Sequence, residues 1–285
     1  MTVLKEEIYI TLAYWLGQIG CDVSVDRGAI DPECFNILVG FPYVNDAVID
    51  RLAALEAGYA VFDVELLDDG KINYKPETAH WFRPPLDRLF RNAKAFLSYF
   101  EQSVQFMAQA YDLPVYKLAP ACCPALTTHA PRGEADCDID ILFFGRVYDT
   151  RVPVLNDLAD RYSLRLLDVG DVTTSYFRND LAARSRIILH LGHRAPFQHI
   201  GMMRLLSMAH IGAFSLSEER AEIEPALRPL SAWWDAEKMP LVDCVAHWLA
   251  HPAARREQAL IAQNAVKAQA DQRGLSQFWQ AHCAP

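Results

Sequence analysis

The stretch DIDILFFGRVYDTR, residues 138–151, runs from apolar residues directly into a glycine and then two arginines. The apolar residues before Gly145 are typical of a strand buried in a parallel sheet. Open parallel sheets bind ligands beyond the carboxyl ends of their strands, where a glycine can bring the backbone close to a ligand. Arg146 and Arg151 can each donate paired hydrogen bonds to phosphate or carboxylate. The stretch predicts an anion site, with solvated loop arginines as the alternative.

Strands and helices alternate on both sides of this stretch. After it, the apolar spacing predicts helices at 152–162, 175–185 and 199–212, and strands at 164–170, 186–192 and 213–218. Before it, the spacing predicts helices at 1–19, 45–58, 84–93 and 102–112, and strands at 21–26, 34–41, 59–67 and 114–120. The alternation predicts an α/β fold in which two Rossmann-like, doubly wound domains face each other across a cleft. The first half begins almost directly in a helix, so a shortened N-terminal domain is an alternative to a complete one.

Residues 119–137 interrupt the alternation, because they combine prolines and turn-forming residues without apolar periodicity. We interpret them as a linker between two domains. The predicted domains are then 1–118, on the acceptor side, and 138–268. The last helical segment, 269–285, is free to cross back onto the first domain.

The composition limits the classes of function. The chain has 285 residues, of which 52% are hydrophobic and 22% are charged, and this suits two globular domains. No apolar run approaches the roughly 20 residues of a membrane span, and the first residues do not resemble a secretory signal. We therefore expect a cytoplasmic protein without an integral membrane segment. The net charge of -9 argues against nucleic acid as a partner, because phosphate backbones bind basic surfaces.

Cysteine and histidine spacing argues against a metal site. The seven cysteines form no C-x-x-C pair, so neither a zinc site nor a disulfide framework is predicted. His190, His193 and His199 lie close in sequence, but no acidic residue stands at ligand spacing. We interpret them as core or loop histidines. His193, at the end of a predicted strand, is also a candidate contact for a ligand phosphate or sugar.

The second half of the chain contains three segments that form one pattern: DIDILFFGR (138–146), NDLAARSRIILHL (179–191) and MMRLLSMAHIGAFSLSE (202–218). They resemble the C-terminal half of the CgeB-like glycosyltransferases of the GT-B superfamily. That half runs from a D-x-D-[IV]-L-F-[FY]-G strand through a helix-borne arginine to a G-x-[FP]-[LV]-[LV]-S-E ending. The resemblance is strongest over 138–219 and fainter earlier, in FNILVGFPYV, AVFDVELL, LSYFEQSVQFM and KLAPACCP.

The resemblance implies that the C-terminal domain binds a nucleotide-sugar donor. Gly145, Arg146 and Arg151 would approach the donor diphosphate. The amino end of the helix near His199, which carries Arg204, would be directed at the same group. Fixed cations and a helix N-terminus stabilise the charge that develops on a diphosphate leaving group, so neither a metal nor another cofactor is required.

The end of the last strand in the pattern is Glu218. By the resemblance it would accept hydrogen bonds from ribose hydroxyls, and an ordinary surface glutamate is the alternative. The sequence departs from the family at Gly201, where many GT-B enzymes have an acidic residue that binds sugar hydroxyls. It also reads Asp63-Val64-Glu65-Leu66 where the family has N-x-E-Q.

An inverting enzyme needs a base in the N-terminal domain, within hydrogen-bond reach of the acceptor hydroxyl. The candidates are Asp63, Glu65 and His80. Asp63 and Glu65 are two residues apart on a predicted strand, so they point to one side of the sheet. The alternative is that they begin a polar turn. A retaining enzyme needs no such base, and the sequence does not select between the two mechanisms.

Together these features predict a metal-independent glycosyltransferase that moves a sugar from a nucleotide-diphosphate donor to an unidentified acceptor. The acceptor class stays open between a glycan, a protein and a small molecule. The alternative is a catalytically silent GT-B-like protein that binds a nucleotide or a partner protein.

Overall fold

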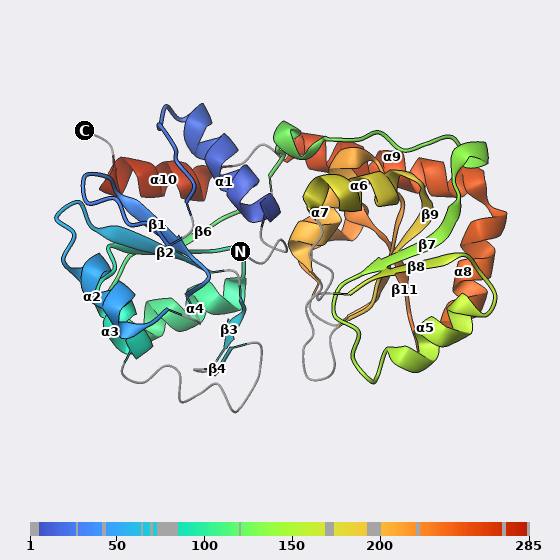
Figure 1. Ribbon diagram of the computed structural model, residues 1–285, viewed down its shortest axis with the longest axis horizontal. Helices are drawn as coiled ribbons and strands as arrows, with labels where there is room; N and C mark the ends of the chain where they lie inside the picture. The colour runs from blue at the N-terminus through green and yellow to red at the C-terminus, as the bar shows by residue number, and fades with distance from the viewer. Residues whose placement is uncertain are drawn as a thin grey trace. The chain divides into compact units, whose positions relative to one another are not determined.

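The computed structural model describes residues 6–26, 28–41, 44–63, 65–68, 71–72, 85–119, 121–168, 174–192, 201–220, 223–269 and 272–283. Contacts within the chain define two compact units. Unit 1 comprises Met1–Val25 and Pro120–Ala270, and unit 2 comprises Asp26–Ala119 and Asp271–Pro285. Each unit contains a parallel sheet with helices packed on it (Figure 1), which confirms the predicted α/β fold with two Rossmann-like halves.

The sheet of unit 1 has five strands in the order β11-β10-β9-β7-β8. All of its strand pairs are parallel. The strands are β7 (Ile139–Phe144), β8 (Leu164–Leu167), β9 (Ser185–His190), β10 (Ser215–Glu218) and β11 (Ala232–Trp234). The helices are α5 (Val152–Ala159), α6 (Ser175–Ala183), α7 (Met202–Ile211), α8 (Leu241–Ala250) and α9 (Pro252–Ala268).

Alternation along β7 explains how its two faces are covered. Ile141 and Phe143 point into a core that also contains residues of α5, α8 and α9. Leu142 and Phe144 point into the opposite core, with residues of α6 and α7. A strand that is apolar on both faces is expected between two layers of helices, which is why this run of the sequence fixes the fold of unit 1.

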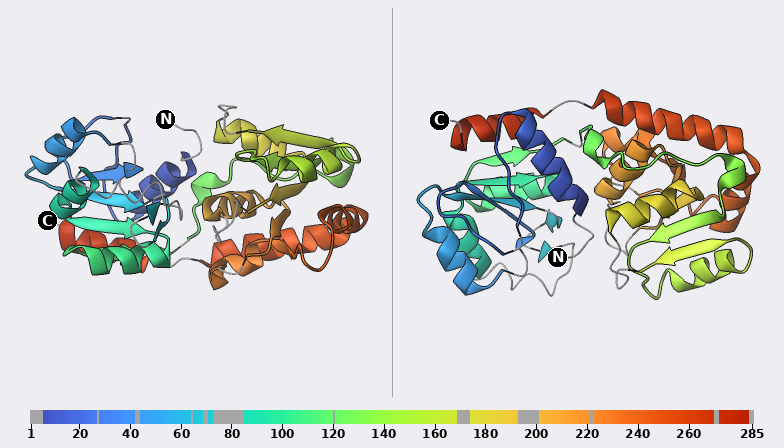
Figure 2. Two further views of the ribbon diagram at one scale, coloured as in Figure 1. Left: turned by 90° about the horizontal axis from the view of Figure 1, so that it is seen from below. Right: turned by 45° about the horizontal axis from the view of Figure 1, so that its top comes forward.

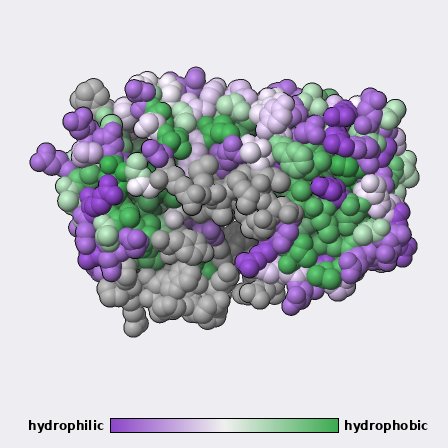
Figure 3. All heavy atoms as spheres, viewed as in Figure 1, coloured by the Kyte–Doolittle hydropathy of each residue, from purple (hydrophilic) through white to green (hydrophobic). Residues whose placement is uncertain are grey.

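The strand β8 forms one edge of this sheet in the described part of the chain. Leu166 in β8 is 40% exposed. In Figure 3 the surface of unit 1 around β8 is predominantly hydrophobic. This edge therefore differs from the opposite one, where Trp234 of β11 is 8% exposed.

The first helix, α1 (Glu6–Gln18), belongs to unit 1, whereas the sequence analysis assigned it to the first domain. Its buried apolar residues are Ile8, Leu12 and Leu16. They pack toward α7 and the 3-10 turn η4 (Pro124–Leu126). An apolar stripe shows which face of a helix is buried but not which neighbour covers it, so sequence order gave the wrong partner.

The segment expected to be a linker is packed against unit 1. Cys123 is fully buried, and Leu126 is 3% exposed. The backbone N–H of Cys123 donates a hydrogen bond of 2.7 Å to Nε2 of His210 in α7. The described residues 121–137 therefore form part of the unit 1 structure, despite their proline-rich sequence.

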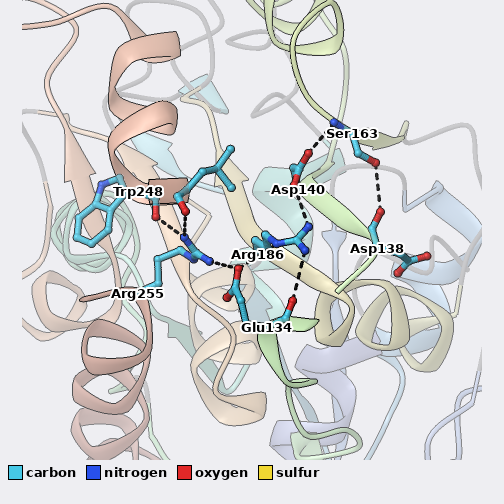
Figure 4. Close-up of polar contacts among 8 residues, drawn as sticks. Glu134, Asp138, Asp140, Ser163, Arg186, Trp248 and Arg255 are labelled. Carbon is cyan, nitrogen blue, oxygen red and sulfur yellow. Dashed lines mark hydrogen bonds and ion pairs between the residues drawn. The ribbon is translucent and has the colours of Figure 1, made fainter. Parts of the chain in front are cut away.

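A charged cluster connects this segment to the sheet and to the junction of α8 with α9 (Figure 4). Glu134, in the 3-10 turn η5 (Glu134–Asp136), accepts hydrogen bonds from Arg186 at 3.0 Å and from Arg255 at 2.5 Å. Arg186 also binds Asp140 of β7 at 2.8 Å. Arg255, which is 3% exposed, donates to the carbonyls of Trp248 and Leu249. The cluster lies where β7 and β9 begin, at the end of the sheet opposite to Gly145.

The sheet of unit 2 has four parallel strands in the order β1-β2-β5-β6. They are β1 (Asn36–Val39), β2 (Tyr59–Asp63), β5 (Ala95–Ser98) and β6 (Val115–Lys117). The helices are α2 (Asp46–Ala53), α3 (Pro85–Asn92) and α4 (Glu101–Ala110), and a short antiparallel hairpin pairs β3 (Leu67–Asp68) with β4 (Lys71–Ile72). Residues 21–26, predicted as a strand, lie outside every strand of the structure.

The final helix, α10 (Arg273–His282), packs against β6 of unit 2 and is the red C-terminal helix in Figure 2. Phe278 is fully buried and contacts the rings of Phe35 and Tyr116. A Cβ atom at Gly274 would lie 2.0 Å from the carbonyl oxygen of Lys117, so only glycine permits this close approach. The chain thus returns to unit 2 after unit 1. None of the helices in the described parts of the chain combines the length and apolar character of a membrane span.

Candidate functional site

The candidate site lies where β7, β9 and β10 of unit 1 end. Gly145 directly follows β7 and has a φ of 141°, in the region that favours glycine. A Cβ atom at Gly145 would lie 2.9 Å from Nη2 of Arg204. Gly145 is therefore needed both for the turn and for the space that the Arg204 guanidinium occupies.

Arg204 is carried by the first turn of α7. This helix has Gly201 at its N-cap position, with no side chain to accept hydrogen bonds from the first N–H groups. The Arg204 guanidinium lies 4.9 Å from the centroid of the Phe144 ring. Burial, and then the charges of Arg151 and Arg178, lower the pKa of Arg204 to about 10. The group is still protonated at neutral pH, and no carboxylate in the described residues pairs with it.

Arg151 supports the backbone of the site. It is 8% exposed, and it donates from Nε to the carbonyl of Gly192 at 3.1 Å and from Nη2 to that of Leu191 at 2.7 Å. It also donates from Nη1 to the carbonyl of Arg146 at 2.5 Å. These bonds join the loop after β7 to the loop after β9. The predicted direct contact of Arg151 with a diphosphate therefore stays a prediction, whereas its contacts with the backbone are observed.

Arg146 differs from Arg151 because its side chain is exposed. Its guanidinium lies 5.6 Å from the centroid of the Tyr148 ring. In the described residues it forms no ion pair with a carboxylate. An exposed arginine beside Gly145 can bind an anion without first breaking a buried contact.

Glu218 ends β10 and is held by two partners. Its Oε2 accepts a hydrogen bond of 2.8 Å from the backbone N–H of Gly192, and its Oε1 pairs with Arg220 at 2.8 Å. A Cβ atom at Gly192 would lie 2.2 Å from the Arg220 guanidinium, which therefore crosses directly over this glycine. Glu218 is at the predicted strand end, but a ligand diol would have to compete with Arg220 for its carboxylate.

The buried His190 lies beside these residues. It is 1% exposed, its Nε2 lies 3.1 Å from the Ser215 hydroxyl, and its ring meets that of Phe144 edge-on. Burial, and then the charge of Arg204, hold the pKa of His190 well below its usual value. It is therefore a neutral core histidine, as the sequence analysis favoured. His193 and His199 lie outside the described residues.

The sequence analysis did not identify Arg178 of α6 as a site residue. Its guanidinium lies 5.2 Å from the centroid of the Phe144 ring, and it forms an ion pair with Glu7 of α1. Arg178 occurs three residues before Leu181 and four before Ala182, both of which are buried. An arginine on the apolar face of a helix was the signal that could have identified it.

In unit 2, the candidate base Asp63 lies at the end of β2 and is fully buried. Its carboxylate accepts hydrogen bonds from the Ser98 hydroxyl at 3.1 Å and from the Glu65 backbone N–H at 2.8 Å. Burial raises the pKa of Asp63 to about 7, although these hydrogen bonds lower it in part. Asp63 is thus an internal carboxyl group, and Glu65 follows the strand in the turn after it. His80 lies outside the described residues.

The described residues contain no cluster of three or more His, Cys, Asp or Glu side chains suited to hold a metal ion. The arginines of the unit 1 site are suited to bind an anion. Arg146 directly follows Gly145 and is exposed, whereas Arg204 packs against Gly145 and is partly buried. Neither arginine forms an ion pair with a carboxylate in the described residues. A phosphate or diphosphate has the charge and the acceptor oxygens to bind such a pair.

Comparison with known proteins relates the fold to solved structures. No protein-family model matches the sequence, and no curated protein matches it. The structure of TarM aligns with 94% of the chain at a TM-score of 0.56 and 8% identity, and the chain spans 57% of TarM. The structure of WaaG, a glycosyltransferase involved in lipopolysaccharide biosynthesis, aligns with 99% of the chain at a TM-score of 0.53 and 11% identity, and 83% of WaaG is covered.

These two likenesses show the fold alone. They relate the fold of this chain to the folds of TarM and WaaG. Because both alignments extend over more than nine tenths of the chain, the likeness includes both units. Fold does not determine function, so the activity has to be argued from the residues of the site.

Proposed function

We propose that this protein is a glycosyltransferase that moves a sugar from a nucleotide-diphosphate donor to an acceptor. Unit 1 binds the donor and unit 2 binds the acceptor. The finer assignment, to the CgeB-like group, rests on the pattern between Asp138 and Glu219.

The observation that carries the proposal is the position of Arg204. The Arg204 guanidinium packs against Gly145, at the carboxyl end of a parallel sheet. In the described residues it has no carboxylate partner. Ligands of open α/β sheets bind at this end. Together with the amino end of α7, Arg204 would stabilise the negative charge that a diphosphate gains as the glycosidic bond breaks.

The proposal includes independence from metal ions. In a metal-dependent enzyme, the cation neutralises the leaving diphosphate. Here Arg146 and Arg204 are suited to that role, with the amino end of α7 beside them. The turnover that we propose would accordingly persist in the presence of a chelator.

A second candidate function is binding without catalysis. Asp63 is fully buried, and its carboxylate oxygens accept hydrogen bonds from protein groups. A general base must reach the proton of the acceptor hydroxyl, and an enclosed carboxyl does not. This observation favours a GT-B-like protein that binds a nucleotide or a partner protein, unless the reaction retains configuration or uses Glu65 or His80.

The experiment that tests the first step is calorimetric titration of the full-length protein with UDP, GDP, ADP, TDP and CDP. We expect one of them to bind, with a loss of affinity of about 100-fold in Arg204→Ala and about ten-fold in Arg146→Ala, because charged hydrogen bonds contribute about 1.5–3 kcal/mol each. Arg161→Ala is the matched control, because Arg161 is exposed and its ion-pair partner in the described part of the chain is Asp157 in the adjacent turn. A wild-type protein that binds none of the five contradicts the proposal.

Turnover separates the two candidate functions. The nucleotide that binds would be offered as a series of nucleotide sugars, and release of the nucleoside diphosphate would be followed with and without a chelator. Release that requires Arg204 establishes an enzyme. Tight nucleotide binding without release from any donor, in the presence of a broad acceptor mixture, favours the silent binding protein.

A further inference from the structure

The helix α6 carries a second buried arginine beside the candidate donor site. Arg178 is 4% exposed, and its guanidinium lies 5.2 Å from the centroid of the Phe144 ring. The Arg204 guanidinium lies 4.9 Å from the centroid of the same ring. Phe144 directly precedes Gly145, so both cations are close to the turn at which the ligand is proposed to bind. The two charges repel each other, and Arg178 contributes to the lowered pKa of Arg204.

The helix α1 supplies the carboxylate that faces Arg178. Glu7 is 6% exposed and forms an ion pair with Arg178. The neighbouring Glu6 accepts a hydrogen bond of 2.8 Å from the backbone N–H of Ser175, the first residue of α6. Both acidic residues of the first turn of α1 therefore contact α6. This arrangement fixes α1 on unit 1 with a buried negative charge next to the arginines.

Glu7 is the ion-pair partner of one of the arginines beside the candidate site. Among the residues that the structure describes, no other carboxylate forms an ion pair with Arg178, and none forms one with Arg204. Arg151 is bonded to backbone carbonyls, which carry no net charge. Glu218 pairs with Arg220. The carboxylate of Glu7 is thus a buried counter-charge of Arg178, whose guanidinium packs on the same Phe144 ring as that of Arg204.

We propose that Glu7 is an internal counter-anion of the candidate donor site, and that it lowers the affinity of the Arg178–Arg204 pair for an anionic ligand. The inference rests on the proposed function, because it concerns the same site. Glu7 and a ligand phosphate are attracted to the same cations and repel each other. Burial strengthens this repulsion, because charges interact more strongly where water is excluded.

The repulsion couples ligand binding to the docking of α1. If the Glu7 carboxylate weakens anion binding, then a bound anion weakens the docking of α1 by the same free energy. The helix leads along the chain through residues 19–25 to Asp26, where unit 2 begins. The docking of α1 is thereby a regulatory contact of the donor site, and α1 precedes one of the covalent connections between the two units.

The test uses inorganic pyrophosphate and nucleoside diphosphates as separate ligands of the full-length protein. We expect Glu7→Gln to bind pyrophosphate about five-fold more tightly than the wild type, from the loss of one nearby buried charge. Arg178→Gln should bind it about five-fold more weakly, because a cation is lost. Glu257→Gln is the control. It removes the same charge from an exposed position of α9, so we expect a change of about two-fold or less.

Two further measurements guard against misfolding of the variants. Thermal unfolding of each variant without ligand establishes that it is folded, and Glu7→Ala, which also removes the charge, replaces Glu7→Gln if the latter is not folded. Hydrogen exchange on the wild type needs no substitution. Saturating pyrophosphate should accelerate exchange of the backbone amides of α1, whereas those of α9 should not change.

The outcomes distinguish this inference from the proposed function. Unchanged or weaker pyrophosphate binding in Glu7→Gln, or unchanged exchange in α1, overturns the counter-anion role. Pyrophosphate binding that strengthens in Glu7→Gln, without binding of any nucleoside diphosphate, supports the counter-anion role and contradicts the proposed function. Nucleoside diphosphate binding that is unchanged in Glu7→Gln and Arg178→Gln supports the proposed function and contradicts the counter-anion role. Absence of binding of either ligand to the wild type contradicts both.

Discussion

The Asp63 carboxylate accepts a hydrogen bond from the Ser98 hydroxyl at 3.1 Å, across the parallel strands β2 and β5 that pair at these two residues. Both residues are fully buried. The pair joins the carboxyl ends of two central strands of unit 2, and it places an ionisable group in a position without contact to water. Its effect is therefore on the pH dependence of folding, whatever its part in catalysis.

We expect Asp63→Asn to change how stability depends on pH. Burial raises the pKa of Asp63 to about 7 in the folded state, well above the value near 4 of an unfolded chain. The folded state thus holds the proton more tightly, and stability from this group is present below pH 4 and is lost as the pH rises through 7. Asparagine does not titrate. The free energy of unfolding of Asp63→Asn, relative to wild type, should rise between pH 4.5 and 7, by at most about 1.4 kcal/mol per pH unit.

Urea unfolding of both proteins at several pH values measures this difference. Asp112→Asn is the control, because Asp112 is an exposed aspartate of unit 2. A constant difference between Asp63→Asn and wild type across the range would show that Asp63 does not titrate abnormally.

We expect Gly145→Ala to weaken both the fold and the anion site. The φ of 141° at Gly145 is unfavourable for alanine, and the new Cβ would lie 2.9 Å from Nη2 of Arg204. The backbone strain should lower the free energy of unfolding by about 1–3 kcal/mol. Displacement of Arg204 should weaken pyrophosphate binding by about ten-fold. Calorimetry measures the affinity and urea unfolding measures the stability.

Gly201→Ala provides the matched comparison, because among the described residues a Cβ at that position would come within 4 Å of the Cβ of Arg204 alone, at 3.8 Å. Its pyrophosphate affinity should stay within about two-fold of wild type, since alanine fits without displacing the guanidinium. Equal affinities of Gly145→Ala and wild type would refute the close approach of Arg204 to Gly145.

The sequence was sufficient to locate most elements of unit 1, because its strands are apolar on both faces and its helices end at clear signals. One such signal is Gly212, which follows α7 with a φ of 73°. In unit 2, the helix predicted at 45–58 begins at Asn45, whose side chain caps α2 by accepting a hydrogen bond from the N–H of Val48. The strand β11 was not predicted, because three residues are too few to show the alternation of a strand.

Other features depend on contacts between residues far apart in the sequence. The placement of α1 on unit 1, and hence the Glu7–Arg178 ion pair, is not encoded in any local pattern. The backbone contacts of Arg151 are a further example, since an arginine after a strand looks the same whether it binds a ligand or the carbonyls of a neighbouring loop. Residue type and spacing predicted that arginines gather at this sheet end, but packing determines which of them are free.

The cluster around Glu134 should contribute to the stability of unit 1. In Glu134→Gln, Arg186 and Arg255 lose a shared carboxylate, and Arg255 is 3% exposed. Because the Glu134 side chain is itself 39% exposed, we expect a loss of only about 1–2 kcal/mol in the free energy of unfolding. Asp157→Asn is the control, since it removes an exposed ion pair with Arg161 and should cost less than about 0.5 kcal/mol. A cost for Glu134→Gln no larger than that of the control would contradict a structural role.

The bond between His210 and Cys123 predicts a sensitivity of unit 1 to acid. Nδ1 of His210 lies 2.7 Å from the carbonyl oxygen of Leu206, which requires a proton on Nδ1, and Nε2 accepts from the N–H of Cys123 at 2.7 Å. A second proton, on Nε2, would remove the latter bond, and burial accordingly lowers the pKa of His210. A lowered pKa means that the unfolded chain binds protons more tightly, so stability from this group is present above pH 6.5 and declines as the pH falls below it.

His210→Gln should be less stable than wild type at pH 7.5, and the difference in the free energy of unfolding should shrink by pH 5.5. His247→Gln, at an exposed position, should follow the wild-type profile. Urea unfolding at the two pH values provides the measurement, and a difference that does not shrink on acidification would show that His210 is not held neutral by Cys123 and Leu206.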